Sequence, residues 1–381
     1  MKGQGRRICA LRPSRGLGGG IEAYIAAVLE ALDREDVIIE ECSLRVPERP
    51  YSLGRRIGFV IETFRAARRL RGSVDSQILV FHPNFSVLGL LLRSIGGSPK
   101  PKLRVVGHGV DVWAAGRWTR RAWRRADLDL VAVSSFTGGA FAPLPVRLLP
   151  PGIPSSRYQA LLASERPSPE LGEPLRILSV FRLGDARIKG AEVLLEAAQD
   201  LVSRRRNVQV TFAGHGPAPA WLERAAESCD WLEVVPSPST DELIRLYARA
   251  NVFVLATLML PNSGEGFGIV LAEAQLAGCV VLAPPLDGSS DAIVPGVTGL
   301  RPIDSSASAL RDTLLWCLDE PHAAARIASN ARVWSSSRFS PDRYREEVAA
   351  VLLDGPSPQD LSISVARANG EHPSKRPPER G

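Results

Sequence analysis

Apolar residues along this chain fall into short continuous runs that alternate with longer stretches of helical period. Short runs predict strands buried on both faces, and apolar positions repeated every three or four residues predict amphipathic helices. The predicted strands are Arg7–Leu11, Val37–Ser43, Gln77–His82, Leu103–Gly107, Leu130–Ser134, Leu175–Val180, Val208–Ala213, Leu232–Val235, Val252–Ala256 and Cys279–Ala283. The predicted helices are Ile21–Leu32, Gly54–Arg71, Phe85–Ile95, Arg117–Ala126, Ala191–Arg204, Pro219–Glu227, Thr240–Arg249, Ile269–Ala277, Ser305–Leu318, Pro321–Trp334 and Pro341–Leu353. This alternation predicts an α/β protein built on parallel sheets.

Two proline clusters interrupt the alternation, the second of them RPSPELGEP at 166–174. Proline fixes φ and removes a backbone donor, so these clusters predict a boundary between two doubly wound domains that face a cleft. The predicted division is a first domain at 1–150, a linker at 151–173, a second domain at 174–340, a closing helix at 341–354 and a disordered tail at 355–381.

Charge is distributed unevenly between the predicted domains. The 381 residues have a net charge of +6, but residues 1–150 hold 24 Lys and Arg against 13 Asp and Glu, a balance of +11, which leaves −5 for the rest. A basic excess predicts an anionic partner. The five scattered cysteines exclude a disulfide framework or a zinc ribbon. No signal peptide or spanning helix is predicted, so we expect a cytoplasmic protein, either free or peripheral at the inner face of the membrane.

The segment Gly264–Leu276, GEGFGIVLAEAQL, combines two carboxylates with a glycine turn that opens a helix. Gly266 and Gly268 permit close approach of backbone to a ligand, and a helix start directs free N–H groups at an anion. Glu265 and Glu273 are expected to face the same end and to accept hydrogen bonds from sugar and ribose hydroxyls. The alternative is an ordinary loop–helix junction with a capping glutamate.

A second candidate loop, FRLGDARIKG at Phe181–Gly190, follows the first strand of the second domain. Ligands bind at the carboxyl ends of strands in open α/β sheets, where Arg182 and Lys189 can neutralise a diphosphate. Taken alone, this loop is more simply read as a solvated surface with two cations.

Two further segments lie at strand ends in the first domain. GLGGGIE at Gly16–Glu22 is a phosphate-cradle candidate that matches neither dinucleotide nor P-loop spacing. VVGHGVDVW at Val105–Trp113 places His108 and Asp111 just past a strand. A lone histidine is more often structural than catalytic, and its position at a strand end raises the weight of the functional reading.

Together these segments resemble the retaining glycosyltransferases of family 4, the glycosyl transferases group 1, over residues 7–353. The resemblance rests on GGGIE, HGVD, the SSFT at Ser134–Thr137, PPGI, FRLGDARIKG, AGHGP, EGFGIVLAE and VVLAPPLDGSSDAIVPGVTGL in this order. It implies the GT-B architecture of two Rossmann-like domains. It also implies transfer of a hexosyl unit, mannosyl- or glucosyl-like, from a nucleotide-diphosphate sugar with retained configuration.

Site residues carry over by position as implications of the resemblance. Glu265 lies near the donor hexose, and the backbone that holds sugar and phosphate oxygens belongs to Gly266, Phe267, Gly268 and Ile269. The cations on the diphosphate are Arg182 and Lys189, and the glycines that close over it are Gly19 and Gly20. Glu273 binds the ribose, His108 stands beside the transferring sugar, and the acceptor side includes Glu22 and Asp111.

No DxD-type metal motif is apparent, and the cationic pair can take the place of a metal, so we predict metal-independent transfer without a cofactor. For the acceptor, the implied role in cell-envelope polysaccharide synthesis predicts a glycan, glycolipid or lipid-linked molecule. The arginine- and aromatic-rich helices RRIGFVIETFRAARRLRG and RWTRRAWRR suit an anionic membrane surface. A solvated arginine face weighs equally, and a soluble acceptor or a non-catalytic sugar-nucleotide binder remains an alternative. A nucleic-acid partner is not expected, because no binding motif is present.

Overall fold

Two parallel β-sheets form the framework of the protein. The computed structural model describes residues 6–16, 18–47, 51–73, 75–125, 127–164, 174–260 and 264–354. The strands of the first sheet are β1 (Arg6–Ser14), β2 (Val37–Arg45), β3 (Ser76–Val80), β4 (Lys102–Gly107), β5 (Asp129–Ala132) and β6 (Val146–Leu148), in the order β2-β1-β3-β4-β5-β6. The strands of the second are β7 (Leu175–Val180), β8 (Val208–Gly214), β9 (Leu232–Pro236), β10 (Val252–Val254) and β11 (Val280–Leu282), in the order β11-β10-β7-β8-β9.

Every pairing between these strands is parallel, which confirms the predicted α/β class. The chain order reverses beside β1 in the first sheet and beside β7 in the second, so each sheet has a topological switch point where ligands bind in such folds. All ten predicted strands are present. The sequence prediction missed β6, which has three residues and lies close to Pro143, Pro145 and Pro150, where the proline cluster masks its short apolar run.

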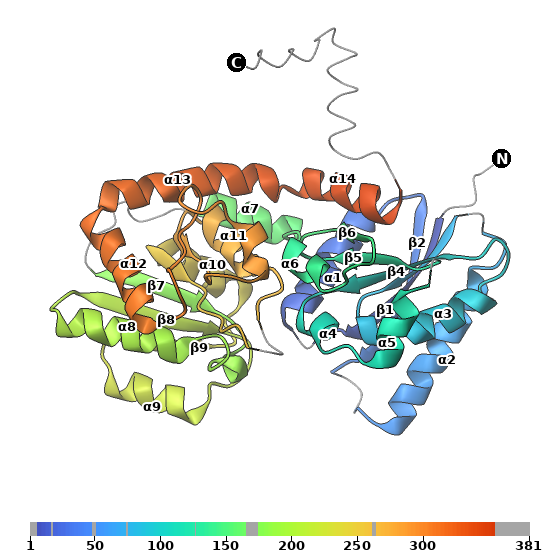
Figure 1. Ribbon diagram of the computed structural model, residues 1–381, viewed down its shortest axis with the longest axis horizontal. Coiled ribbons are helices and arrows are strands. Elements are labelled where there is room, and N and C mark those ends of the chain that lie inside the picture. The colour runs from blue at the N-terminus through green and yellow to red at the C-terminus, as the bar shows by residue number, and fades with distance from the viewer. Residues whose placement is uncertain are drawn as a thin grey trace, which may run out of the picture.

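Helices cover both faces of the first sheet (Figure 1). Those that precede β6 are α1 (Gly20–Leu32), α2 (Leu53–Arg69), α3 (Ser86–Ile95), α4 (Val110–Trp113), α5 (Arg117–Trp123) and α6 (Ser135–Gly139). Alternate residues of β1 face opposite ways, as the pleat requires. Cys9 and Leu11 enter a core with Phe59 of α2 and Trp123 of α5, whereas Ile8 and its same-face neighbours pack with α1.

The second half of the chain repeats this arrangement around the second sheet. Its helices are α7 (Ser155–Ala163), α8 (Ala191–Ser203), α9 (Ala220–Ser228), α10 (Thr240–Arg249), α11 (Ile269–Leu276), α12 (Ala307–Asp319), α13 (Pro321–Arg338) and α14 (Pro341–Leu352). Helix α7 lies in the segment predicted as a linker, and the remainder of that linker, 165–173, falls outside the described residues. The predicted tail 355–381 also falls outside them.

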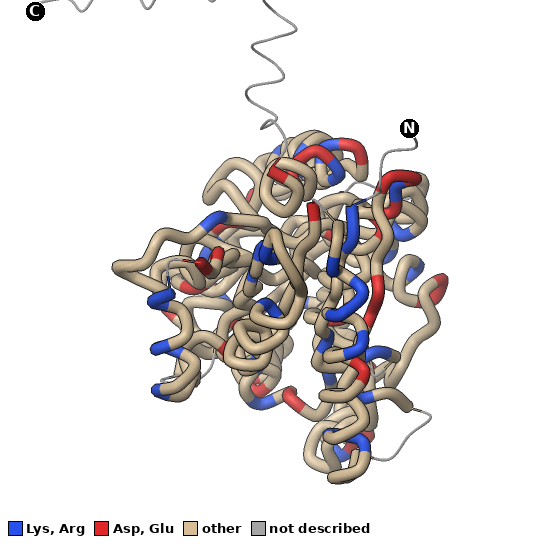
Figure 2. Tube along the Cα trace, turned by 90° about the vertical axis from the view of Figure 1, so that its right-hand side faces the viewer, with Lys and Arg blue, Asp and Glu red and all other residues tan. Residues whose placement is uncertain are grey.

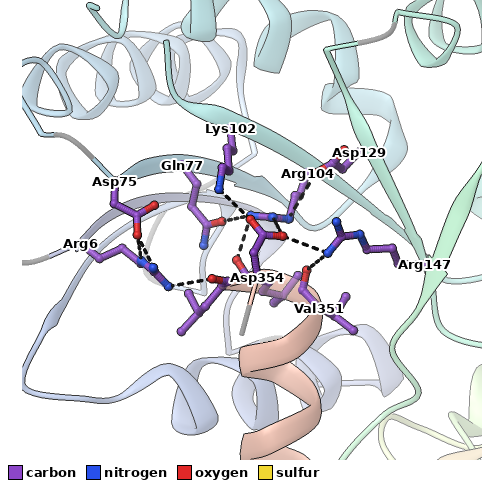
Figure 3. A network of polar contacts seen from close by, with 11 residues as sticks. Arg6, Asp75, Gln77, Lys102, Arg104, Asp129, Arg147, Val351 and Asp354 are labelled. Atoms are coloured by element: carbon purple, nitrogen blue, oxygen red, sulfur yellow. Dashed lines mark hydrogen bonds and ion pairs between the residues drawn. The ribbon is translucent and has the colours of Figure 1, made fainter. Parts of the chain in front are cut away.

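Helix α14 returns from the second sheet to pack on the first, where its main helical partner is α1 (Figure 1). A polar network fixes its C-terminal end (Figure 3). The buried Arg104 of β4 donates to the Leu352 carbonyl at 2.8 Å and to Asp354 at 2.7 Å, and its third partner is Gln77 at 2.5 Å. Arg147 reaches Asp354 at 3.0 Å. These cations stabilise the C-terminal end of α14, which carries the negative end of the helix dipole. The helix is therefore fixed to the first sheet, although in the sequence it directly follows the second domain.

Candidate active site

The loop between β7 and α8 places two cations at the carboxyl edge of the second sheet. Arg182 is exposed, and its guanidinium lies 4.0 Å from Asp185. Lys189 is partly buried, and its Nζ donates to Glu265 Oε2 at 2.7 Å. Thr257, just after β10, donates to the same oxygen at 3.2 Å. The structure therefore brings together two segments that the sequence treats as separate candidates, FRLGDARIKG and EGFG.

The charge of Lys189 is stabilised in this setting. Burial opposes the ammonium charge, but the attraction of Glu265 and the hydrogen bond that Lys189 donates to it, with further attraction from Asp185 and Asp287, raise the pKa of Lys189 above its usual value. An ammonium group has three donors, and Glu265 uses one of them. Glu265 therefore leaves two of the Lys189 donors for other acceptors.

The glycine loop of the first domain lies directly opposite Arg182. A Cβ on Gly19 would stand 2.7 Å from Arg182 Nη2, and Gly19 has φ +110°, a conformation that side chains disfavour. A Cβ on Gly18 would stand 3.3 Å from the ring of His215, which follows β8. The carboxylate of Glu22 accepts from the Gly18 N–H at 3.0 Å and thereby braces the loop.

The N-termini of two helices flank Arg182 and Lys189. Helix α1 begins at Gly20, immediately after Gly19, and α11 begins at Ile269, after Gly268 with φ +76°. The first N–H groups of a helix have no intrahelical acceptor and favour an anion. The Phe267 side chain is buried and packs edge-on against Phe339, which fixes the backbone in front of α11.

Gly266, in the EGFG segment of the second domain, contacts the first domain. A Cβ on Gly266 would collide with the carbonyl oxygen of His108, and a Cβ on Gly109 would stand 3.2 Å from the Gly266 Cα. Thr137 Oγ1 of α6 also reaches the Gly266 carbonyl, at 3.5 Å. Only a glycine at position 266 permits this approach of the two backbones, which places the segment that contains Glu265 next to His108.

The imidazole of His108 has a defined tautomer and is neutral near pH 7. Its Nε2 lies 3.1 Å from the Phe81 carbonyl, which can only accept, so the proton is on Nε2 and Nδ1 is an acceptor. Tyr24 packs edge-on against the ring at 4.9 Å. Burial lowers the pKa of His108 to about 4, although the Phe81 bond acts in the opposite direction. His108 therefore offers a lone pair, suited to a hydroxyl of a bound sugar.

Asp111 serves its own loop in this structure. Its carboxylate accepts from the His108 N–H at 3.0 and 3.2 Å. Burial raises the pKa of Asp111, with His82 and the local N–H groups acting in the opposite direction. The sequence prediction named Asp111 for the acceptor side. In the structure its carboxylate binds the backbone of His108. His82, which follows β3, is electrostatically coupled to both residues and was not singled out from the sequence.

Glu273 is the predicted site residue with the most complete set of protein partners. It is buried in α11, where Oε1 accepts from Arg157 of α7 at 2.9 Å and Oε2 accepts from Tyr247 of α10 at 2.9 Å. A ribose diol at Glu273 must replace or share one of these bonds. The ribose assignment stays a prediction.

The domain interface contains a polar contact that the sequence did not reveal. Ser135, at the start of α6, donates its N–H at 2.5 Å and its hydroxyl at 2.6 Å to Asp291 of the second domain. The SSFT segment was one of the motifs that carried the family resemblance, but nothing in the sequence paired Ser135 with a carboxylate 156 residues away.

Within the described ranges, no group of three or more His, Cys, Asp or Glu side chains has the arrangement of a metal site. No helix in those ranges is long and apolar enough to cross a bilayer.

Comparison with known proteins defines the class. Residues 163–334 match the family model described as Glycosyl transferases group 1. The chain is 29% identical to the GDP-mannose-dependent alpha-(1-6)-phosphatidylinositol monomannoside mannosyltransferase of Mycobacterium tuberculosis (strain CDC 1551 / Oshkosh), over 75% of this chain and 78% of that protein. It is 25% identical to the D-inositol 3-phosphate glycosyltransferase of Acidothermus cellulolyticus, over 90% and 79%.

Solved structures share the fold at low identity. Anabaena HepE, in complex with UDP-glucose, superposes with a TM-score of 0.69 at 17% identity, covering 91% of this chain and all of that one. Sucrose-phosphate synthase from Thermosynechococcus elongatus gives 0.68 at 18% identity, covering 95% and 100%. The fold and the family match thus define this protein as a glycosyltransferase of the GT-B architecture. Its residues 163–334 match the glycosyl transferases group 1 and the named relatives are transferases of this kind, which supports the resemblance drawn from its motifs.

Proposed function

We propose that this enzyme transfers a hexosyl unit, mannosyl or glucosyl, from a nucleotide-diphosphate sugar to a glycan, glycolipid or lipid-linked acceptor of the cell envelope, with retention of configuration. One observation carries the proposal. Arg182 lies against Gly19 across the cleft, while Lys189 is held 2.7 Å from Glu265. A diphosphate in this position meets the two cations of the second domain and one helix N-terminus from each domain.

The charge distribution suits cleavage of a glycosyl–phosphate bond. The bond between the anomeric carbon and the diphosphate oxygen breaks, the electron pair stays on the diphosphate, and the sugar becomes positively charged. Arg182, Lys189 and the N–H groups at Ile269 stabilise the leaving group, with each good donor worth about 3 kcal/mol. The acceptor hydroxyl then bonds to the anomeric carbon and gives its proton to the departing phosphate. The cationic groups supply the role that a metal fills elsewhere, so we propose metal-independent transfer.

The donor hexose is assigned to the meeting point of Glu265, Gly266 and His108. The neutral His108 presents Nδ1 as an acceptor, and Glu265 provides a carboxylate held by Lys189 and Thr257. Two acceptors with fixed positions distinguish sugar hydroxyl patterns. The names of the M. tuberculosis relative and of Anabaena HepE mention GDP-mannose and UDP-glucose respectively, and both donors are included in the test below.

The acceptor side is assigned to the basic first domain, and a membrane surface is proposed beside it. Helix α2 exposes Leu53 by 72%, Ile57 by 53% and Ile61 by 46%, although a helix normally buries such side chains. On α5, Trp118 is 65% exposed, and the guanidinium of Arg117 lies 5.0 Å from the centre of its ring. Figure 2 looks onto this end of the molecule and shows Lys and Arg on several of its segments. Apolar and cationic groups on one surface suit anionic headgroups.

The proposal is tested by incubating the full-length enzyme with GDP-, UDP- and ADP-hexoses and measuring release of nucleoside diphosphate. Phosphatidylinositol mannoside, inositol phosphate and an envelope lipid extract serve as acceptors, and the anomeric configuration of the product is read by NMR. Transfer to a lipid supports the main proposal, and transfer to inositol phosphate alone supports the alternative of a soluble acceptor. Absence of both transfer and hydrolysis with every donor contradicts the proposal. Flotation with anionic liposomes at low salt tests the membrane surface separately.

A further inference from the structure

Apolar side chains from the two domains meet beside Glu265, at a point that the proposed donor site does not use. Trp113 ends α4 in the first domain, and Met259 follows β10 in the second. A Cβ on Gly264 would stand 3.1 Å from Met259 Sδ and 3.2 Å from Trp113 Cη2. The indole edge and the thioether therefore both contact the glycine that precedes Glu265, one from each side of the cleft.

Trp113 is held rigidly in this position. Phe136 of α6 packs perpendicular to its ring, with centroids 5.6 Å apart. The guanidinium of Arg120 donates to the Trp113 carbonyl at 2.9 Å and to the Ala115 carbonyl at 3.0 Å, which fixes the end of α4. A bulky side chain held in one orientation before a ligand arrives loses little entropy when it binds.

The surroundings of this contact are aliphatic and open to solvent. Val110 is 41% exposed and shares a face of α4 with Trp113, three residues further on. Met259 is 41% and Leu260 is 46% exposed. A single exposed apolar side chain needs no explanation, but here several from both domains lie close in sequence to the residues assigned to the donor hexose. We name the set Val110, Trp113, Phe136, Met259 and Leu260 the apolar bridge.

We propose that the apolar bridge binds the hydrocarbon portion of the acceptor, an aliphatic chain attached near the hydroxyl that receives the sugar. The inference rests on the proposed function and names the class of acceptor. The donor does not supply a matching group, because its diphosphate is assigned to Arg182 and Lys189 and its hexose is polar. A sugar ring stacks on an aromatic face, whereas Val110, Met259 and Leu260 offer aliphatic surface, and methionine adapts its shape to a flexible chain.

The test compares octyl and methyl glycosides of the same sugar, used below the micelle concentration, and measures binding by calorimetry in the presence of nucleoside diphosphate. Burial of several methylene groups predicts at least tenfold tighter binding of the octyl glycoside by the wild type. Trp113→Ala and Met259→Ser should each reduce that preference at least threefold and leave nucleoside diphosphate affinity unchanged. Val333→Ser, which alters a side chain 70% exposed on α13, is the matched control and should retain the preference.

Equal binding of octyl and methyl glycosides by the wild type overturns the proposal. A preference that survives in both variants also overturns it, because the chain then binds elsewhere. Met259 lies on an exposed loop, so its variant decides the matter if Trp113→Ala fails to fold. The binding readout is independent of turnover, so a wild type that binds the octyl chain but processes no donor contradicts the proposed function, while failure to bind the octyl chain contradicts this inference alone.

Discussion

Lys189 donates to Glu265 across 2.7 Å, and this contact joins the two loops of the second domain to which the donor is assigned in our proposal. One residue follows β7 and the other precedes α11, 76 positions apart. The pair keeps the Lys189 ammonium charged in a partly buried position and holds the Glu265 carboxylate in place. Most of the proposed chemistry depends on this arrangement.

The Lys189–Glu265 pair predicts coupled losses on substitution. Lys189→Met removes a donor to the leaving group and leaves Glu265 without its cation, so we expect turnover to fall at least ~100-fold. Glu265→Gln keeps the shape but loses the charge, and we expect a fall of about tenfold or more. Because the residues are in contact, the double variant should lose less than the product of the single losses. Strictly multiplicative losses would show that the two side chains act independently.

His108 predicts the shape of the pH profile. Burial lowers its pKa to about 4, so the ring remains neutral between pH 5 and pH 8 and keeps Nδ1 free to accept. The kcat/KM profile should therefore show no histidine inflection near 6.5, and activity should fall only when acid protonates the ring. An inflection near 6.5 in the wild type that disappears in His108→Gln would contradict the assigned protonation state.

Metal dependence separates two ways of stabilising the leaving diphosphate. If Arg182 and Lys189 perform this task, transfer rates should change less than twofold after dialysis against EDTA. Mn²⁺ or Mg²⁺ added afterwards should have no effect beyond that of ionic strength. Loss of transfer with EDTA and its recovery with either metal would overturn the metal-independent mechanism.

The α14 network predicts a large effect from one buried arginine. Arg104→Met leaves the Leu352 carbonyl and Asp354 without a principal donor, and we expect a loss of about 1.5–3 kcal/mol in the free energy of unfolding. Arg147→Ala, at a side chain 47% exposed, is the control and should cost less than about 1 kcal/mol. Equal losses of unfolding free energy in the two variants, measured by denaturant titration, would show that Arg104 contributes no more to stability than Arg147.

The same network predicts a direction for acid stability. Burial acts to raise the pKa of Asp354, but hydrogen bonds and attraction from Lys102 and Arg104 outweigh it and hold the pKa well below its usual value. A carboxylate with a depressed folded pKa stabilises the protein above the unfolded value, near pH 4. That stabilisation is lost as the pH falls further, and Asp354→Asn should reduce this acid dependence.

Local sequence pattern predicted most of the fold, because buried parallel strands and amphipathic helices have distinct periods. The start of α11 at Ile269 and the glycine turn before it were predicted from the sequence, and the end of the helix was predicted one residue late, at Ala277. Short elements were missed where packing rather than pattern creates them. Strand β6 lies among prolines, and α7 lies in a segment that proline content marked as a linker.

The relationships between distant residues could not be predicted from the chain. The contact of Gly19 with Arg182 and that of Gly266 with His108 depend on how two domains meet, which no local period encodes. Glu273 illustrates the limit. Its spacing from Glu265 suggested an acceptor for a ribose. Whether such an acceptor is free depends on the neighbouring helices, and here Arg157 of α7 and Tyr247 of α10 both donate to it.

The central claim is that Arg182 stabilises the diphosphate leaving group, and the most direct measurement compares Arg182→Ala with Arg187→Ala. Both arginines lie in the same loop, but Arg187 is 69% exposed and pairs with Glu192 at 3.3 Å. Nucleoside diphosphate release is measured with the best donor at saturating acceptor. We expect the rate to fall at least ~100-fold for Arg182→Ala and less than twofold for Arg187→Ala. A near-normal rate for Arg182→Ala would contradict it.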